Sequence, residues 1–267
     1  MKKVYVVLSL LLVFSLLLSA CGENNAPSIT EWTDLDGKTL AVFGLAVSED
    51  DFAEMINSKL GIELKSGVIV PTPAEMALLI QNGQVDAGST HVYNAKYICA
   101  RNDDLDYIVG KTMAASMVFV KGSGLKSEID QAIAALKADG TIDNLVDTWL
   151  SDEAMKSDPQ PAVLETIPGA DTIKVGISGV LAPMDYATAD GKPGGFNVAL
   201  IGEISKHIGK NVEFVNIDPD SRFLALSSGT IDMFFWNFYN TFITEDYEIS
   251  EPYLEDNGAL IIRKAAD

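Results

Sequence analysis

Aromatic and carboxylate side chains gather in two short stretches whose chemistry suits a small organic ligand. Their residues are Met184, Asp185 and Tyr186 in one stretch and Trp236, Asn237, Phe238 and Tyr239 in the other. Aromatic faces beside a carboxylate attract a cation or a planar amine through cation–π contacts and charge pairing. The alternative, in which the rings form core or wall, is favoured for the neighbouring Phe234 and Phe235.

The histidines and cysteines form neither a metal pattern nor a disulfide framework. His91 and His207 are the two histidines, and neither has a second ligand at metal spacing. Cys99 lies in an apolar stretch and is expected to be a buried, inert thiol. We therefore expect no metal, no cofactor and no stapling disulfide.

Cys21 closes a stretch that is typical of lipoprotein export. Lys2 and Lys3 precede an apolar run, and Leu18-Ser19-Ala20 stands directly before the cysteine. This order predicts a signal peptide over residues 1–20 and a lipid on the Cys21 thiol. An uncleaved transmembrane helix is the alternative, but the run is shorter than the ~20 apolar residues that a bilayer core requires. We expect an extracytoplasmic protein anchored to the cell membrane.

The mature chain would be strongly acidic. Without residues 1–20 it has 247 residues and a formal charge of -21, since the whole chain carries -19 and loses Lys2 and Lys3. Such a charge repels nucleic acid and anionic lipid, so neither is expected as a partner. The length allows one large domain or two lobes.

Two segments, residues 33–116 and 171–258, repeat one order of strands and helices. This alternation predicts two α/β lobes, each with a mostly parallel sheet flanked by helices. The expected elements are strands 39–43, 62–65 and 85–87 with helices 50–60 and 73–82, and then strands 173–177, 211–214 and 231–235 with helices 196–208 and 221–228. Gly83 and Gly229 follow the second helix of each segment, where a left-handed residue ends a helix.

The remaining segments connect these lobes. Residues 21–32 form a polar tether. Residues 123–150 have the spacing of two short amphipathic helices broken at Asp139-Gly140, and residues 151–170 are a proline-containing linker. Apolar strands within residues 117–122 and 259–267 are expected to cross between the lobes.

Several motifs resemble the extracytoplasmic solute-binding proteins of polar amino-acid ABC transporters, family 3. They are Asp34-Leu-Asp-Gly-Lys-Thr39, Ala135-Leu-Lys-Ala-Asp-Gly-Thr141 with Trp149, Ala182-Pro-Met-Asp-Tyr186, Asp190-Gly-Lys-Pro-Gly-Gly-Phe196 and Ser250-Glu-Pro-Tyr253. The resemblance implies a type 2 periplasmic-binding fold, in which two lobes hold a ligand between them and close by a hinge.

The order of the lobes differs from that family. Members usually begin with the lobe that resembles residues 171–258, insert the lobe that resembles residues 33–116, and finish with helices like residues 123–150. The usual second lobe comes first here, so the chain resembles a circularly permuted member. Exchange of lobes between two chains is the alternative, and we expect a monomer or a lobe-swapped dimer.

The groups by which relatives clamp an α-amino acid are missing. The resemblance places a carboxylate-binding arginine within residues 235–253, which contain no arginine or lysine, and an acidic residue at position 91, which is His91. Ser48 can still cap a helix, but the acidic residues 49–51 weaken the pull of that helix on an external anion. Arg222 is expected to have a structural role on its own helix and not to bind the ligand.

His91 and Ser48 join residues 184–186 and 236–239 as the expected ligand site. The resemblance implies that the protein delivers a small polar or cationic organic solute, amino-acid-like or an amine, to an ABC permease and its ATPase. A sensory or interaction lipoprotein that has lost transport is one alternative. An enzyme like the cyclohexadienyl dehydratases is another, and it would have to recruit His91, Glu245 or Asp185 as acid or base. We expect a binding protein, because no such group has an identifiable partner.

Overall fold

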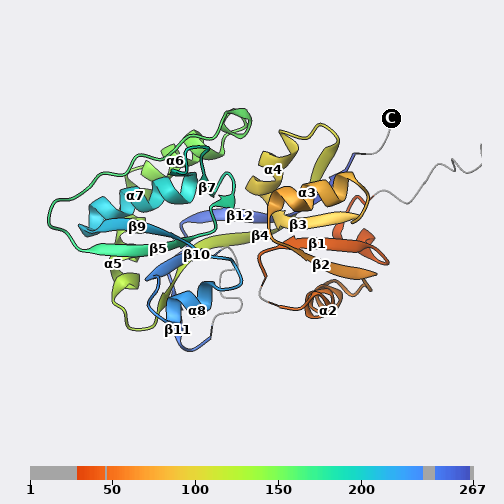
Figure 1. The fold of residues 1–267 in the computed structure, drawn as a ribbon, viewed down its shortest axis with the longest axis horizontal. Helices are drawn as coiled ribbons and strands as arrows, with labels where there is room; N and C mark the ends of the chain where they lie inside the picture. Colours follow the sequence, from red (N-terminus) through yellow and green to blue (C-terminus); the bar gives the residue numbers. More distant parts are fainter. Residues whose placement is uncertain (1–28, 46, 237–243, 265–267) are drawn as a thin grey trace, which may run out of the picture.

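Two α/β lobes lie side by side in the computed structural model, which describes residues 29–45, 47–236 and 244–264. Two long strands, β4 (Leu105–Val120) and β12 (Leu254–Arg263), run through both lobes and join them (Figure 1). The predicted two-lobed α/β fold is thereby confirmed. Within the described ranges, every helix is too short or too polar to cross a bilayer.

The first lobe is built on a sheet with the strand order β2-β1-β3-β12-β4. Its own elements are η2 (Trp32–Leu35), β1 (Thr39–Phe43), α2 (Glu49–Leu60), β2 (Ser66–Val70), α3 (Pro73–Gln81), β3 (Ala87–His91) and α4 (Val92–Cys99). β1 pairs in parallel with β2 and β3, whereas β12 joins antiparallel. α3 and α4 pack on one face of this sheet, and α2 and η2 pack on the other.

The second lobe repeats this plan around β5, with the strand order β4-β10-β5-β9. Its elements are α5 (Leu125–Ala138), α6 (Thr141–Leu150), η3 (Ala154–Lys156), β5 (Thr172–Ile177), β6 (Val180–Leu181), β7 (Asp185–Ala187), β8 (Pro193–Gly194), α7 (Phe196–Ile208), β9 (Asn211–Asn216), α8 (Arg222–Ser227), β10 (Met233–Trp236) and β11 (Tyr247–Ile249). β9 and β10 pair in parallel with β5. α5 and α6 pack on α7, so the helices before the linker belong to this lobe.

The same junction occurs in both lobes. Gly83 and Gly229 have the predicted left-handed backbone, with φ of 70° and 72°. Three residues after each glycine comes an aspartate. Asp86 accepts a hydrogen bond from the first backbone N–H of β1 at 2.8 Å, and Asp232 accepts one from the N–H of Lys174 in β5 at 2.7 Å. Each lobe thus ties its helix-to-strand turn to a neighbouring parallel strand, β1 or β5, through one carboxylate.

Some expected strands lie elsewhere. The strand expected at residues 62–65 is wrong, because β2 begins at Ser66. Gly67 lets this strand approach α2 closely: a Cβ on it would lie 2.7 Å from the Glu49 carbonyl oxygen. β4 and β12 begin well before the apolar segments that were expected to cross, since their more polar halves pair with each other. α4 was not predicted.

Candidate functional site

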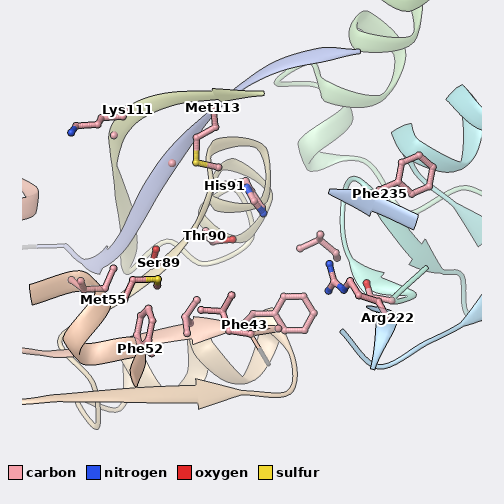
Figure 2. Close-up of a pocket in the computed structure, with 18 of the residues that line it drawn as sticks. Phe43, Phe52, Met55, Ser89, Thr90, His91, Lys111, Met113, Arg222 and Phe235 are labelled. Atoms are coloured by element: carbon pink, nitrogen blue, oxygen red, sulfur yellow. The ribbon is translucent and has the colours of Figure 1, made fainter. Parts of the chain in front are cut away.

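A cavity of about 870 Å³ lies between the lobes and continues into the first lobe (Figure 2). On the first-lobe side, Phe43 ends β1 and His91 ends β3, and both side chains line it. On the second-lobe side, the lining includes Ile177 at the end of β5, Arg222 at the start of α8 and Phe235 in β10. The cavity therefore meets the carboxyl ends of the parallel strands, where ligands bind in open α/β sheets.

Arg222 brings a positive charge into this cavity. Its side chain points from α8 into the space between the lobes (Figure 2). Nε donates to the Pro219 carbonyl oxygen at 2.7 Å, and the guanidinium carbon lies 5.7 Å from the centre of the Phe234 ring. Burial lowers the pKa of Arg222 to about 10, against the opposing charges of Asp185 and Asp220. The guanidinium is therefore charged at neutral pH.

His91 faces the cavity as a neutral imidazole. Its side chain is 14% exposed, and Nδ1 lies 3.8 Å from Oδ2 of the buried Asp256. Burial lowers the pKa of His91, Asp256 opposes that shift, and Arg222 adds to it. Because burial dominates, we treat the contact with Asp256 at neutral pH as one between a neutral ring and a carboxylate, and not as an ion pair.

Asp185 organises the wall of the second lobe. Its Oδ1 accepts hydrogen bonds from the Ser178 backbone N–H at 2.9 Å, the Ser178 hydroxyl at 2.7 Å and the Gly179 N–H at 3.1 Å. Its Oδ2 accepts a hydrogen bond from Asn197 Nδ2 at 3.5 Å, and the Oδ1 of Asn197 accepts one from the Tyr253 hydroxyl at 2.9 Å. This carboxylate holds the loop at residues 178–179, so much of its hydrogen-bonding capacity is already used.

The predicted site residues do not all meet at the cavity. Asp185 and His91 line it. Met184 is fully buried in the core of the second lobe. The Tyr186 hydroxyl donates to the Gln160 carbonyl oxygen at 2.8 Å and accepts from the Gln160 N–H at 3.1 Å, so it fastens the linker. Ser48 is exposed and caps α2 as predicted, but it is not among the lining residues.

The second aromatic stretch lies mostly beyond the described ranges. Asn237, Phe238 and Tyr239 fall outside the described residues, as do the predicted signal peptide and the predicted lipidation site Cys21. The backbone of Trp236 pairs with Ser116 in β4. The buried Phe234 and Phe235 both line the cavity and so act as its wall.

Sequence reasoning missed Arg222 as a cavity residue. It recognised this arginine but assigned it to its own helix. The loop before α8 carries two acidic residues, Asp218 and Asp220, and no feature of the sequence indicates which way the guanidinium points. Phe43 was missed as well, because it was read only as a strand residue, and Ser89 was missed because the expected strand ended at residue 87, whereas β3 continues to His91.

The comparison with protein families gives a match that covers most of the second lobe and the strand β12. Residues 173–267 match the model of the bacterial extracellular solute-binding proteins, family 3. This segment of the chain is therefore similar to that family. It carries β5, α7, α8 and β10 of the second lobe, and therefore Arg222, Asp185 and Phe235 of the cavity. No curated protein sequence matches the chain.

Solved structures to which the chain is similar include binding proteins and a DNA-bound protein. Arginine-bound ArgBP from T. maritima is 17% identical, over 85% of this chain and 88% of that one, with a TM-score of 0.41. The ligand-binding component of an ABC-type import system from Staphylococcus aureus is 12% identical, covers 85% of this chain and 66% of that one, and has a TM-score of 0.45. For full-length CbnR with its target DNA the identity is 10%, the coverage is 86% of this chain and 64% of that one, and the TM-score is 0.44. The chain thus spans less than two thirds of the last two, and at these TM-scores no ligand or partner is carried over.

Proposed function

We propose that this chain is the lipid-anchored, extracytoplasmic solute-binding component of an ABC importer. The observation that carries the proposal is the cavity of about 870 Å³ between two lobes that two strands join. Sites for drug-sized organic ligands have volumes of roughly 300–1,000 Å³. The family 3 match over residues 173–267 supports binding of a solute. Cys21 would hold the protein at the membrane, beside the permease and its ATPase.

The solute places an anionic or hydrogen-bond-accepting group at Arg222. This guanidinium points into the cavity and keeps its charge at neutral pH. A cationic solute, which the sequence led us to expect, would need a carboxylate with free capacity. Asp185 is the carboxylate expected for that role, and its Oδ1 already accepts three hydrogen bonds. The geometry therefore favours an organic anion over an amine.

Thermal shift of the full chain with a panel of organic anions and matched amines tests this proposal. Ligands that bind the folded state raise the unfolding temperature. We expect stabilisation by at least one anion, and binding at least tenfold weaker in Arg222→Gln. Lys121→Gln, which removes one exposed charge outside the cavity, is the control. Absence of binding across the panel would refute the proposal, and prephenate turnover that His91→Ala abolishes would support the enzyme alternative.

The anchor and the segment order have their own tests. Cys21→Ser should abolish incorporation of radioactive palmitate and release the protein from membranes.

The first lobe contains both residue 29 and the last residue of β12, which supports a circular permutation of the usual order. A chain that begins at residue 171 and joins residue 264 to residue 29 by a short linker should unfold at a similar temperature and stay monomeric. A dimer of the natural chain by light scattering would favour lobe exchange.

A further inference from the structure

We infer that the solute carries an apolar arm, which lies in a side chamber inside the first lobe. This inference rests on the proposed function and adds the chemical class of the ligand. The side chamber is the part of the cavity lined by Trp32, Val42, Phe52, Met55, Ile56 and Met113. The ligand is therefore an amphipathic organic anion, with its charged group at Arg222 and an aliphatic or aromatic arm.

The side chamber exists because α2 covers only part of its face of the sheet. α2 lies against the edge strand β2, where Gly67 permits a close approach. Toward the middle of the sheet, this face carries Ser89 in β3, Gly258 in β12 and Gly110 in β4, and all three line the cavity. Small side chains on the strands leave space between the sheet and α2, whose Phe52, Met55 and Ile56 line the same cavity.

Trp32 lies across two of these glycines. A Cβ on Gly110 would lie 2.7 Å from Nε1 of Trp32, and a Cβ on Gly258 would lie 3.7 Å from Cζ2. The indole therefore rests on a part of the sheet where no side chain intervenes. Its Nε1 is buried and has no hydrogen-bond partner among the described residues. This ring makes the side chamber aromatic on the side of η2.

The walls of the side chamber are apolar and largely enclosed. Phe52 is 1% exposed, Val42 is 7% exposed and Ile56 is 9% exposed. Met55 and Met113 add thioethers, which adapt their shape to a ligand. The lysines and the glutamate that line the same cavity are exposed residues, so their charges are solvated: Glu31, Lys59 and Lys111.

The side chamber is continuous with the cleft but belongs to one lobe. Its lining residues come from η2, β1, α2, β3, β4 and β12 of the first lobe. Hinge closure changes the distance between lobes and leaves such an internal space open. A ligand held only between the lobes would leave the side chamber empty, whereas an apolar arm gains from burial there.

Isothermal titration of the full chain with n-alkanoates from butanoate to decanoate tests the inference. We expect Kd to fall about fourfold per added methylene until the side chamber is full. Met55→Trp should fill the side chamber and remove this gain, so that the Kd values of the longer alkanoates no longer fall with chain length. The matched control is Leu78→Trp, on α3 at the opposite face of the same sheet, where Leu78 is 57% exposed.

Two further measurements keep the outcome clear if Met55→Trp folds poorly. Ser89→Leu narrows the side chamber from the strand side and should have the same effect. Octanoate should also change the fluorescence of Trp32, and Trp32→Phe should remove that signal. Binding of butanoate without a gain for longer chains would overturn the inference and leave the proposed function standing. A Kd that still falls with chain length in both Met55→Trp and Ser89→Leu would also overturn the inference, and so would binding of other anions without binding of any alkanoate.

If no anion and no amine binds, the proposed function itself is refuted.

Discussion

Removal of one buried hydroxyl, in Tyr253→Phe, should cost a measurable part of the stability. Tyr253 is 1% exposed and donates to Asn197 Oδ1 at 2.9 Å. Burial raises the pKa of Tyr253 well above its usual value, so the donor stays protonated. Phenylalanine would leave the buried Asn197 oxygen without this donor, which costs about 1–3 kcal/mol. At about 2–4 °C per kcal/mol for a chain of this size, the unfolding temperature should fall by about 2–12 °C.

Tyr247→Phe is the matched control for this experiment. The Tyr247 hydroxyl donates to the Phe223 carbonyl oxygen at 3.3 Å, and the residue is only half-buried, so water replaces the lost bond. We expect a loss near the lower limit for a hydrogen bond, about 0.5 kcal/mol. Urea unfolding followed by circular dichroism gives both values from the midpoints, provided that the slopes agree. Equal losses in the two variants would refute the reasoning that burial of Asn197 sets the cost.

Three further predictions concern a turn, a thiol and an imidazole. In Gly229→Ala the new Cβ meets no atom within 4 Å, so the substitution should cost only the left-handed backbone, about 1–2 kcal/mol. Gly83→Ala should cost about the same, because its Cβ would lie 3.1 Å from the guanidinium of the exposed Arg263, which can move away; a clearly lower urea midpoint for Gly83→Ala would contradict this. Burial raises the pKa of Cys99 to about 12, so iodoacetamide at pH 8 should alkylate the folded chain far more slowly than the unfolded one, and equal rates would refute it. Burial lowers the pKa of His91 below its ordinary 6.5, so as the pH falls the unfolded chain takes up a proton before the folded chain does, and stability decreases below pH 6.5. In His91→Gln the urea midpoint should therefore decrease less between pH 7 and pH 5 than in the natural chain, and an equal decrease in both would count against this reasoning.

Most elements of the fold could be predicted from local patterns. The helix at Phe196–Ile208 was predicted with its observed bounds, and Gly83 and Gly229 end their helices as expected. These features depend on neighbouring residues, through amphipathic spacing and backbone freedom. The strand at Ser66–Val70 was missed because Gly67 is unfavourable in a strand unless a neighbouring element needs the space. Here α2 needs that space, and this contact is not visible in the sequence around Gly67. The early start of β4 was missed for a similar reason, since its pairing with β12 joins residues far apart in the chain.

The candidate site was predicted less well than the fold. The sequence identified the Asp185 loop and His91, and both line the cavity. It assigned Met184 and Tyr186 to the ligand, whereas the structure uses them for the core and the linker. It also assigned Arg222 to its helix, and the guanidinium points into the cavity. A motif locates a loop near a cleft, but it does not give the direction of each side chain within that loop.

The sequence by itself determined the two repeated α/β lobes, the order in which they occur and the residue types available at their strand ends. Those properties follow from periodicity, turn chemistry and composition, which act over a few residues. Only the tertiary structure decided which charge enters the cavity and how far the cavity extends. Arg222 faces inward because of the way α8 packs beside β10. The side chamber opens because α2 lies over β2 and does not extend over the small residues of β3, β4 and β12. Such outcomes depend on contacts between distant segments, so no local pattern specifies them.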